Sequence, residues 1–148
     1  HVGTVTVTGV EPSAAMRETF VRLWPTEALP LPRLLAGKWE TSEVPRADVV
    51  FASNALYRVR DIGEALRKMT GHAHRRVIIV QTIGRPHAAP LMLTRDGVDL
   101  ERERADALCD VLAAMGVAFR RRVYAIDRGD SEPCNVALID WPTASGGA

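Results

Sequence analysis

The chain has 148 residues, of which 47% are hydrophobic and 25% are charged, and its formal net charge is +1. These values suit one globular domain, and the charge gives no reason to expect nucleic-acid binding through a broad basic surface. Cys109 and Cys134 form no CxxC pair and have no histidine pair nearby, which excludes the common zinc patterns. No apolar run is long enough to span a bilayer and no signal peptide is visible, so the cytoplasm is the expected location.

The first part of the chain alternates strand and helix signals. Residues 4–10 (TVTVTGV) are rich in β-branched residues and predict a strand. Ser13 offers a helix cap, and apolar residues then follow one helical face until Pro25 ends the helix. A proline-containing loop leads to a short apolar strand over residues 33–36. Residues 47–52 (ADVVFA) form a near-continuous apolar run, which suits a strand buried in a parallel sheet.

The second part continues this alternation. Asp61 with Glu64 three residues later resembles a capping box and predicts a second helix. Residues 76–80 (RVIIV) predict the next buried strand, and the glycines and prolines of residues 83–99 predict a long irregular crossover. A third helix stops at Gly116, and two strands joined by turn residues follow as an antiparallel hairpin. The last two strands are expected at residues 117–126 and 135–141. The apolar faces of the three predicted helices consist, in chain order, of Met16, Phe20 and Leu23; of Ile62, Ala65, Leu66 and Met69; and of Ala105, Leu108, Leu112 and Met115.

This order predicts an α/β fold. Alternating strands and helices favour a Rossmann-like, mostly parallel sheet with helices on both faces. The C-terminal antiparallel hairpin is a narrower signal. We expect residues 1–148 to form a single domain.

Four segments resemble class I S-adenosylmethionine-dependent methyltransferases, in the right order over nearly the whole chain. Residues 7–16 (VTGVEPSAAM) are similar to the second-strand segment of that family. Residues 46–57 (RADVVFASNALY) are similar to its fourth-strand segment, residues 59–69 to the helix that follows, and residues 75–80 to its fifth strand. The family also has the terminal antiparallel hairpin. The resemblance implies S-adenosylmethionine as cofactor and methyl transfer to an unidentified acceptor.

The resemblance places the adenosyl group against two loops. An acidic residue at the end of the second strand can accept hydrogen bonds from both ribose hydroxyls, and Glu11 has that place, followed by Pro12 and Ser13. By resemblance, Trp39 stacks on the adenine ring and Glu40 accepts a hydrogen bond from its amino group. The alternatives are an exposed loop carboxylate for Glu11 and a packed core side chain for Trp39.

Further candidates follow the fourth-strand segment, since ligands of open α/β sheets bind outside the carboxyl ends of the strands. The resemblance implies that Ser53 and Asn54 face the amino-acid part of the cofactor and that Tyr57 faces the substrate. The alternative is that Asn54 and Tyr57 only close a loop. The family often has histidine at the position of Asn54, so proton transfer there is not expected. His87, in the crossover, is a candidate for lining the substrate site, and its alternative is a solvent-facing position. No catalytic residue and no metal ligand is predicted.

The glycine-rich turn that follows the first strand in the family has no counterpart, because no GxG occurs in the sequence. The resemblance begins at the second strand and the first residue is His1, so we expect the chain to be incomplete at its N-terminus. Residues 4–10 and 47–52 would then have unpaired edges. We expect one of three outcomes: the two strands pair directly with each other, a further segment lies between them, or a second chain supplies the missing strand. A homodimer is therefore one of the alternatives.

Three functions remain open from the sequence. The first is methyl transfer from S-adenosylmethionine. The second is a non-catalytic methyltransferase-like module that binds a partner or acts as a scaffold. The third is a nicotinamide-dinucleotide-binding Rossmann domain, which also places an acid after its second strand, although the terminal hairpin argues against it.

Overall fold

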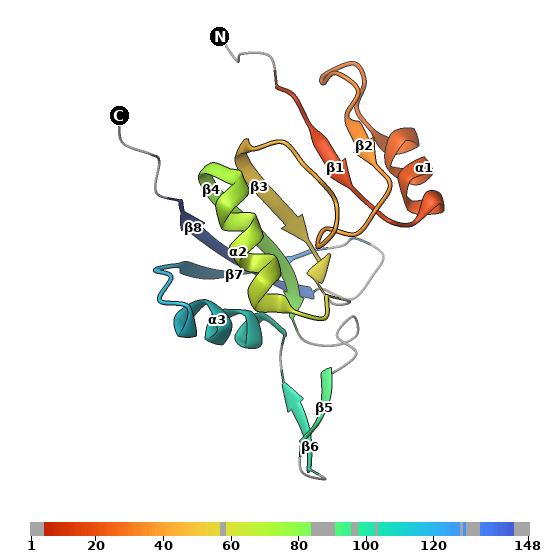
Figure 1. Cartoon of the computed structure of the whole chain (residues 1–148). Coiled ribbons are helices and arrows are strands. Elements are labelled where there is room, and N and C mark those ends of the chain that lie inside the picture. Colours follow the sequence, from red (N-terminus) through yellow and green to blue (C-terminus); the bar gives the residue numbers. More distant parts are fainter. Residues whose placement is uncertain are drawn as a thin grey trace. The chain divides into compact units, whose positions relative to one another are not determined.

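The computed structural model describes residues 5–56, 59–83, 91–95, 98–102, 104–127, 129 and 134–143. The chain divides into two compact units, His1–Pro45 and Arg46–Ala148, each described by itself below. Figure 1 shows the elements of both units. None of the helices in the described ranges is long and apolar enough to cross a membrane.

The first unit holds β1 (Thr8–Val10), α1 (Ala14–Leu23) and β2 (Arg33–Leu35), and its two strands pair in parallel (Figure 1). Ser13 caps α1 as predicted, because its Oγ accepts a hydrogen bond from the Met16 amide at 3.4 Å. Gly9 allows the two strands to pack closely, since a Cβ at that position would lie 2.8 Å from Leu34 Cδ2. β1 is shorter than the predicted residues 4–10, because only the residues opposite β2 have strand partners.

The second unit contains a four-stranded sheet. Its strands lie in the order β3-β4-β8-β7, with β3 parallel to β4 and β8 antiparallel to both of its neighbours. The strands predicted at residues 47–52 and 76–80 are parallel, as expected, and the predicted terminal hairpin is confirmed. The elements are β3 (Ala47–Ser53), α2 (Ile62–His72), β4 (Ala73–Ile83), α3 (Arg104–Ala114), β7 (Arg120–Ile126) and β8 (Cys134–Pro142).

Both helices of this unit pack on the same face of the sheet (Figure 1). Trp141 of β8 donates a hydrogen bond from Nε1 to Thr70 Oγ1 on α2 at 3.1 Å, and Arg121 of β7 pairs with Asp106 on α3 at 2.8 Å. The central residues of β4 and β8 on this side are fully buried, so the core of the unit lies between these strands and the two helices. Its largest buried apolar side chains are Leu66, Val77, Ile79, Leu112, Ile139 and Trp141.

The crossover predicted to be irregular contains a hairpin, so that prediction is wrong. β5 (Leu91–Arg95) and β6 (Val98–Arg102) pair in antiparallel register. The sequence between them is Asp-Gly, which is among the strongest short signals for a tight hairpin turn. The glycines and prolines of the whole crossover were interpreted as loop residues, so the Asp-Gly turn was not recognised.

The expected closure of the strand at residues 4–10 onto the strand at residues 47–52 is not found. Among the described residues, β1 pairs with β2 in a two-stranded sheet, and β3 pairs with β4 in the four-stranded sheet.

Candidate functional site

The first candidate group lies at the carboxyl ends of β1 and β2. The Glu11 amide donates to the Leu35 carbonyl at 3.1 Å, which ties the two strand ends together. The half-buried Glu11 carboxylate accepts a hydrogen bond from the Ser13 amide through Oε1 at 2.8 Å. Glu11 therefore lies where the sequence predicted it, at the end of a parallel strand and with one oxygen held by the following helix start.

Arg17 organises this loop, and the sequence analysis did not single it out. Its Nη1 donates to the carbonyl of Glu11 at 2.7 Å and to the carbonyl of Pro12 at 2.9 Å. These bonds hold the backbone that carries the Glu11 carboxylate. The available signal was weak, since it consisted only of a basic residue one turn into the helix that follows the acid.

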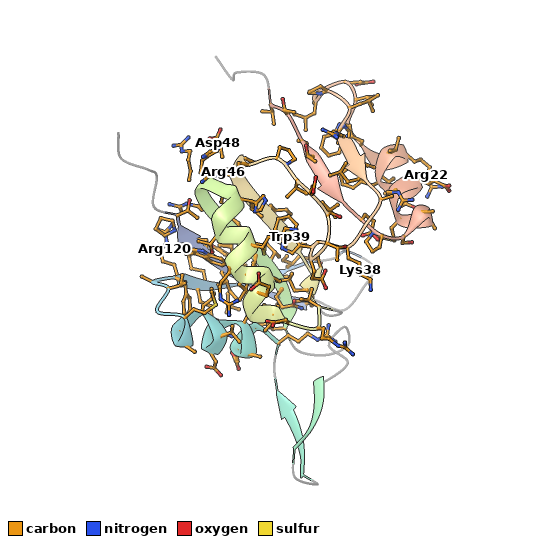
Figure 2. The ribbon with its side chains drawn as sticks, in the orientation of Figure 1. Arg22, Lys38, Trp39, Arg46, Asp48 and Arg120 are labelled. Atoms are coloured by element: carbon orange, nitrogen blue, oxygen red, sulfur yellow. The ribbon has the colours of Figure 1, made fainter. Side chains whose placement is uncertain are left out.

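Trp39 and Glu40 lie in the turn that follows β2. The amides of Thr41 and Ser42 both donate to the Lys38 carbonyl, at 3.2 and 3.0 Å, which closes the turn around the two candidates. Trp39, which is labelled in Figure 2 beside Lys38, is half-buried, and Glu40 is exposed. Trp39 is thus not fully enclosed, so part of its surface is open to a ligand.

Asn54 follows β3 and is held firmly in place. Its φ of 47° lies in the left-handed region, and its amide donates to the Val80 carbonyl at 2.9 Å. Its Oδ1 accepts from the Thr82 amide at 2.8 Å and from Gln81 Nε2 at 3.1 Å, and its Nδ2 donates to Thr82 Oγ1 at 3.0 Å. Asn54 therefore fastens the carboxyl end of β3 to that of β4. This agrees with the alternative in which Asn54 closes a loop.

The remaining candidates differ in what the structure describes. Ser53, beside Asn54, is exposed. Tyr57 and His87 lie outside the described residues. Gln81 and Thr82 were missed from sequence, although they directly follow the apolar run of residues 76–80 and so mark the carboxyl end of a parallel strand.

Neither cysteine has the surroundings of an activated nucleophile. Both are free, and burial raises the pKa of the Cys109 thiol above its usual range despite the opposing charge of Arg121. The described residues also contain no group of three His, Cys, Asp or Glu side chains placed to hold a metal ion.

No family model and no curated protein matches the sequence. Solved structures do match. Magnesium protoporphyrin IX methyltransferase (ChlM) from Synechocystis PCC 6803, with bound SAM, aligns at a TM-score of 0.57 and 14% identity over 95% of this chain and 60% of its own. The YcgJ protein from Bacillus subtilis aligns at a TM-score of 0.65 and 12% identity over 95% of this chain and 83% of its own. The N-methyltransferase NodS from Bradyrhizobium japonicum WM9, in complex with S-adenosyl-L-homocysteine, aligns at a TM-score of 0.54 and 15% identity over 93% of this chain and 67% of its own.

The chain has the class I methyltransferase fold. It spans 60% of the length of the ChlM chain that it matches. Within this methyltransferase fold, β1 and β3 are the segments expected as the second and fourth strands. Glu11, which follows β1, and Ser53 and Asn54, which end and follow β3, therefore lie at carboxyl ends of parallel strands, where open α/β sheets bind ligands.

Proposed function

We propose that the chain contributes to an S-adenosylmethionine-dependent methyltransferase with an acceptor still to be identified. One observation carries the proposal: Glu11 stands at the carboxyl end of a parallel strand in a chain with the class I methyltransferase fold. Two solved structures with this fold, those of ChlM and NodS, contain bound SAM or its demethylated product.

In this proposal the first unit holds the adenosyl group. The Glu11 carboxylate accepts hydrogen bonds from the ribose hydroxyls, and the Ser13 amide and the Arg17 guanidinium keep that carboxylate in position. Trp39 stacks on the adenine ring, and Glu40 accepts a hydrogen bond from the adenine amino group. A charged acceptor strengthens such hydrogen bonds, so Glu11 is the residue with the largest expected effect on affinity.

The second unit holds the amino-acid part of the cofactor. Ser53 offers an exposed hydroxyl for this role, while Asn54 chiefly fixes the ends of β3 and β4. Tyr57 and His87 are proposed to line the acceptor site. The cofactor supplies the electrophilic methyl group, so the protein needs mainly to position it in line with a nucleophile. The cytoplasm remains the proposed location.

Equilibrium dialysis with radiolabelled S-adenosylhomocysteine tests the proposal. We expect saturable but weak binding, with a Kd of about 0.1–1 mM, because the sequence has no glycine-rich turn to supply backbone donors. Unlabelled S-adenosylmethionine should displace the label, and NAD should not. Absence of saturable binding, or equal displacement by NAD, would contradict the proposal.

A non-catalytic binding module is the second candidate. Under this alternative the chain keeps the fold and lacks cofactor affinity, so the dialysis experiment separates the two candidates. The antiparallel β7–β8 pairing beside β4 does not favour the nicotinamide-dinucleotide alternative.

A further inference from the structure

β7 forms one edge of the four-stranded sheet, because among the described strands it pairs only with β8. All of its residues, Arg120–Ile126, are exposed. Its register with β8 runs without a bulge and its sequence contains no proline, so neither of these devices protects the edge. A strand that fills the slot expected beside residues 47–52 would join the sheet at β3, at the opposite end of the strand order. The outer backbone N–H and C=O groups of β7 can therefore pair with a further strand.

A buried carboxylate draws two of the β7 arginines toward β8. Asp140 of β8 is 1% exposed and accepts hydrogen bonds from Arg120 at 2.7 Å and from Arg122 at 3.3 Å. Arg76 of β4 donates to the same carboxylate at 2.7 Å, and these three arginines are here called the arginine triad. Burial raises the pKa of Asp140, but its bonds to Arg120 and Arg122 and the charge of Arg76 outweigh burial and leave this pKa below its usual range. Asp140 is therefore ionised and holds these guanidinium groups away from the outer edge.

The third arginine of β7 also has a partner within the chain. Arg121 pairs with Asp106 of α3 at 2.8 Å, on the face of the sheet that the helices cover. Charged side chains protect a sheet edge when they stand free beside it. Each arginine of β7 instead contacts a carboxylate of its own chain, which reduces the repulsion that these charges exert on a similar strand.

Val123 lies at the centre of β7 and leaves an apolar side chain exposed at the edge. It pairs with the fully buried Ala137, so it lies on the same face of the sheet as the helices. α3 packs against β4 and β8, and Val123, on the edge strand beyond them, is 52% exposed. Its exposure is therefore a property of the edge, on the face that the helices of this unit already cover.

The sequence of β7, RRRVYAI, is self-complementary in one arrangement. When two copies run antiparallel with Val123 opposite Val123, no arginine stands directly opposite an arginine. Arg122 of each copy then stands opposite Tyr124 of the other, where a cation–π contact can form. Arg120 of each copy stands opposite Ile126 of the other. A parallel pairing in register would instead place every arginine opposite its own counterpart, which is unfavourable.

We propose that β7 pairs antiparallel with β7 of a second copy of this chain, about a two-fold axis at Val123. Main-chain hydrogen bonds then join the two sheets into one, and the two Val123 side chains cover each other at the axis. The interface is isologous, so it closes as a dimer. This dimer differs from one that fills the slot beside residues 47–52, which would use β3. The inference stands on the second unit and does not depend on cofactor binding.

Sedimentation velocity of the 148-residue chain tests the association. Because a single strand pair makes a small interface, we expect a reversible dimer with a Kd of about 10–100 µM. Val123→Lys places two like charges opposite each other at the axis and should raise this Kd about tenfold or more. Val49→Lys makes the same change at an exposed valine of β3, the other edge strand, and should leave the Kd unchanged. A chain that stays monomeric at about 500 µM would overturn the proposal, as would a dimer that only Val49→Lys dissociates.

Cysteine crosslinking tests the register. Val123→Cys brings two thiols together at the axis with their Cα atoms about 4.5–5.5 Å apart, within reach of a disulfide. Ala125→Cys, at an exposed residue on the same face, would lie about 14 Å from its counterpart and is the matched control. Oxidation should give a covalent dimer for Val123→Cys only, and the wild type reports any crosslinking through the native cysteines. Equal crosslinking of the two variants, or none in either, would contradict the proposal. Loss of cofactor binding in the dialysis experiment would leave these results unaffected.

Discussion

At the scale of a single residue, the sequence predicted the position of Asn54 but not its hydrogen-bond partners. Its place after an apolar strand predicted a position at the carboxyl end of the sheet, and the structure confirms that position. Its partners, Gln81 and Thr82, lie 27 and 28 residues further along the chain, so they become visible only once the strand register is known.

Two substitutions at Asn54 separate its hydrogen bonds from its backbone conformation. Asn54→Gly loses the side-chain bonds to β4 but accepts a positive φ without strain, and we expect a loss of about 1–2 kcal/mol in the free energy of unfolding. Asn54→Ala loses the same bonds and adds the left-handed strain, so it should cost about 1 kcal/mol more. Urea unfolding followed by tryptophan fluorescence measures both. Equal stability of the two variants would show that the φ of 47° imposes no cost.

Glu11 carries the proposed contact with the ribose. Glu11→Ala should weaken S-adenosylhomocysteine binding by about 1–3 kcal/mol, the usual cost of losing hydrogen bonds to a charged group. Glu27→Ala removes an exposed carboxylate from the same unit and serves as the control, with no expected change in affinity. Calorimetry that gave the same affinity for Glu11→Ala and the wild type would remove Glu11 from the site.

At the scale of elements, the sequence predicted features that depend on neighbouring residues, such as helix caps. It did not predict contacts that depend on how strands distant in the sequence pair with each other. The caps at Ser13 and Asp61 depend on residues three positions away, and both are confirmed. The arginine triad consists of Arg122, Arg120 and Arg76, which bond to Asp140 from 18, 20 and 64 positions away. These residues become neighbours only once the strand register is known, so the sequence alone does not show the triad.

The charge of Asp140 makes the stability of the β4–β8–β7 part of the sheet depend on pH. The pKa of Asp140 is lowered in the folded chain, so its contribution is fully present above the unfolded value near 4 and is lost as the pH falls through the lower folded value. Asp140→Asn should lower the free energy of unfolding by about 1–3 kcal/mol at pH 7.

The difference between wild type and Asp140→Asn should shrink as the pH falls from about 4 toward 2. Urea unfolding at several pH values, followed through the fluorescence of the buried Trp141, measures it. Asp48→Asn, at an exposed carboxylate of β3, is the matched control and should show little difference at any pH. A difference for Asp140→Asn that stayed constant down to pH 2 would show that the charge of Asp140 does not act through the triad.

At the scale of the whole molecule, the order of elements predicted an α/β fold with a terminal antiparallel hairpin. The four segments that resemble class I methyltransferases narrowed this prediction to the methyltransferase fold, which the solved structures share. The division at Pro45 and the edge position of β7 were not predicted, because both depend on which strands pair across the sheet. The single domain over residues 1–148 stays a prediction, as do the site residues.

Amide chemical shifts during a titration with S-adenosylhomocysteine test the central claim most directly, because they report on both units in one measurement. We predict shifts at Glu11 and Ser13, at Trp39 and at Ser53 and Asn54, which lie at or beyond the carboxyl ends of β1, β2 and β3. Amides of the β7–β8 strands around the arginine triad should not change. Shifts confined to the triad and the rest of β7, or no shifts at millimolar ligand, would contradict the assignment of the cofactor to the carboxyl ends of the parallel strands.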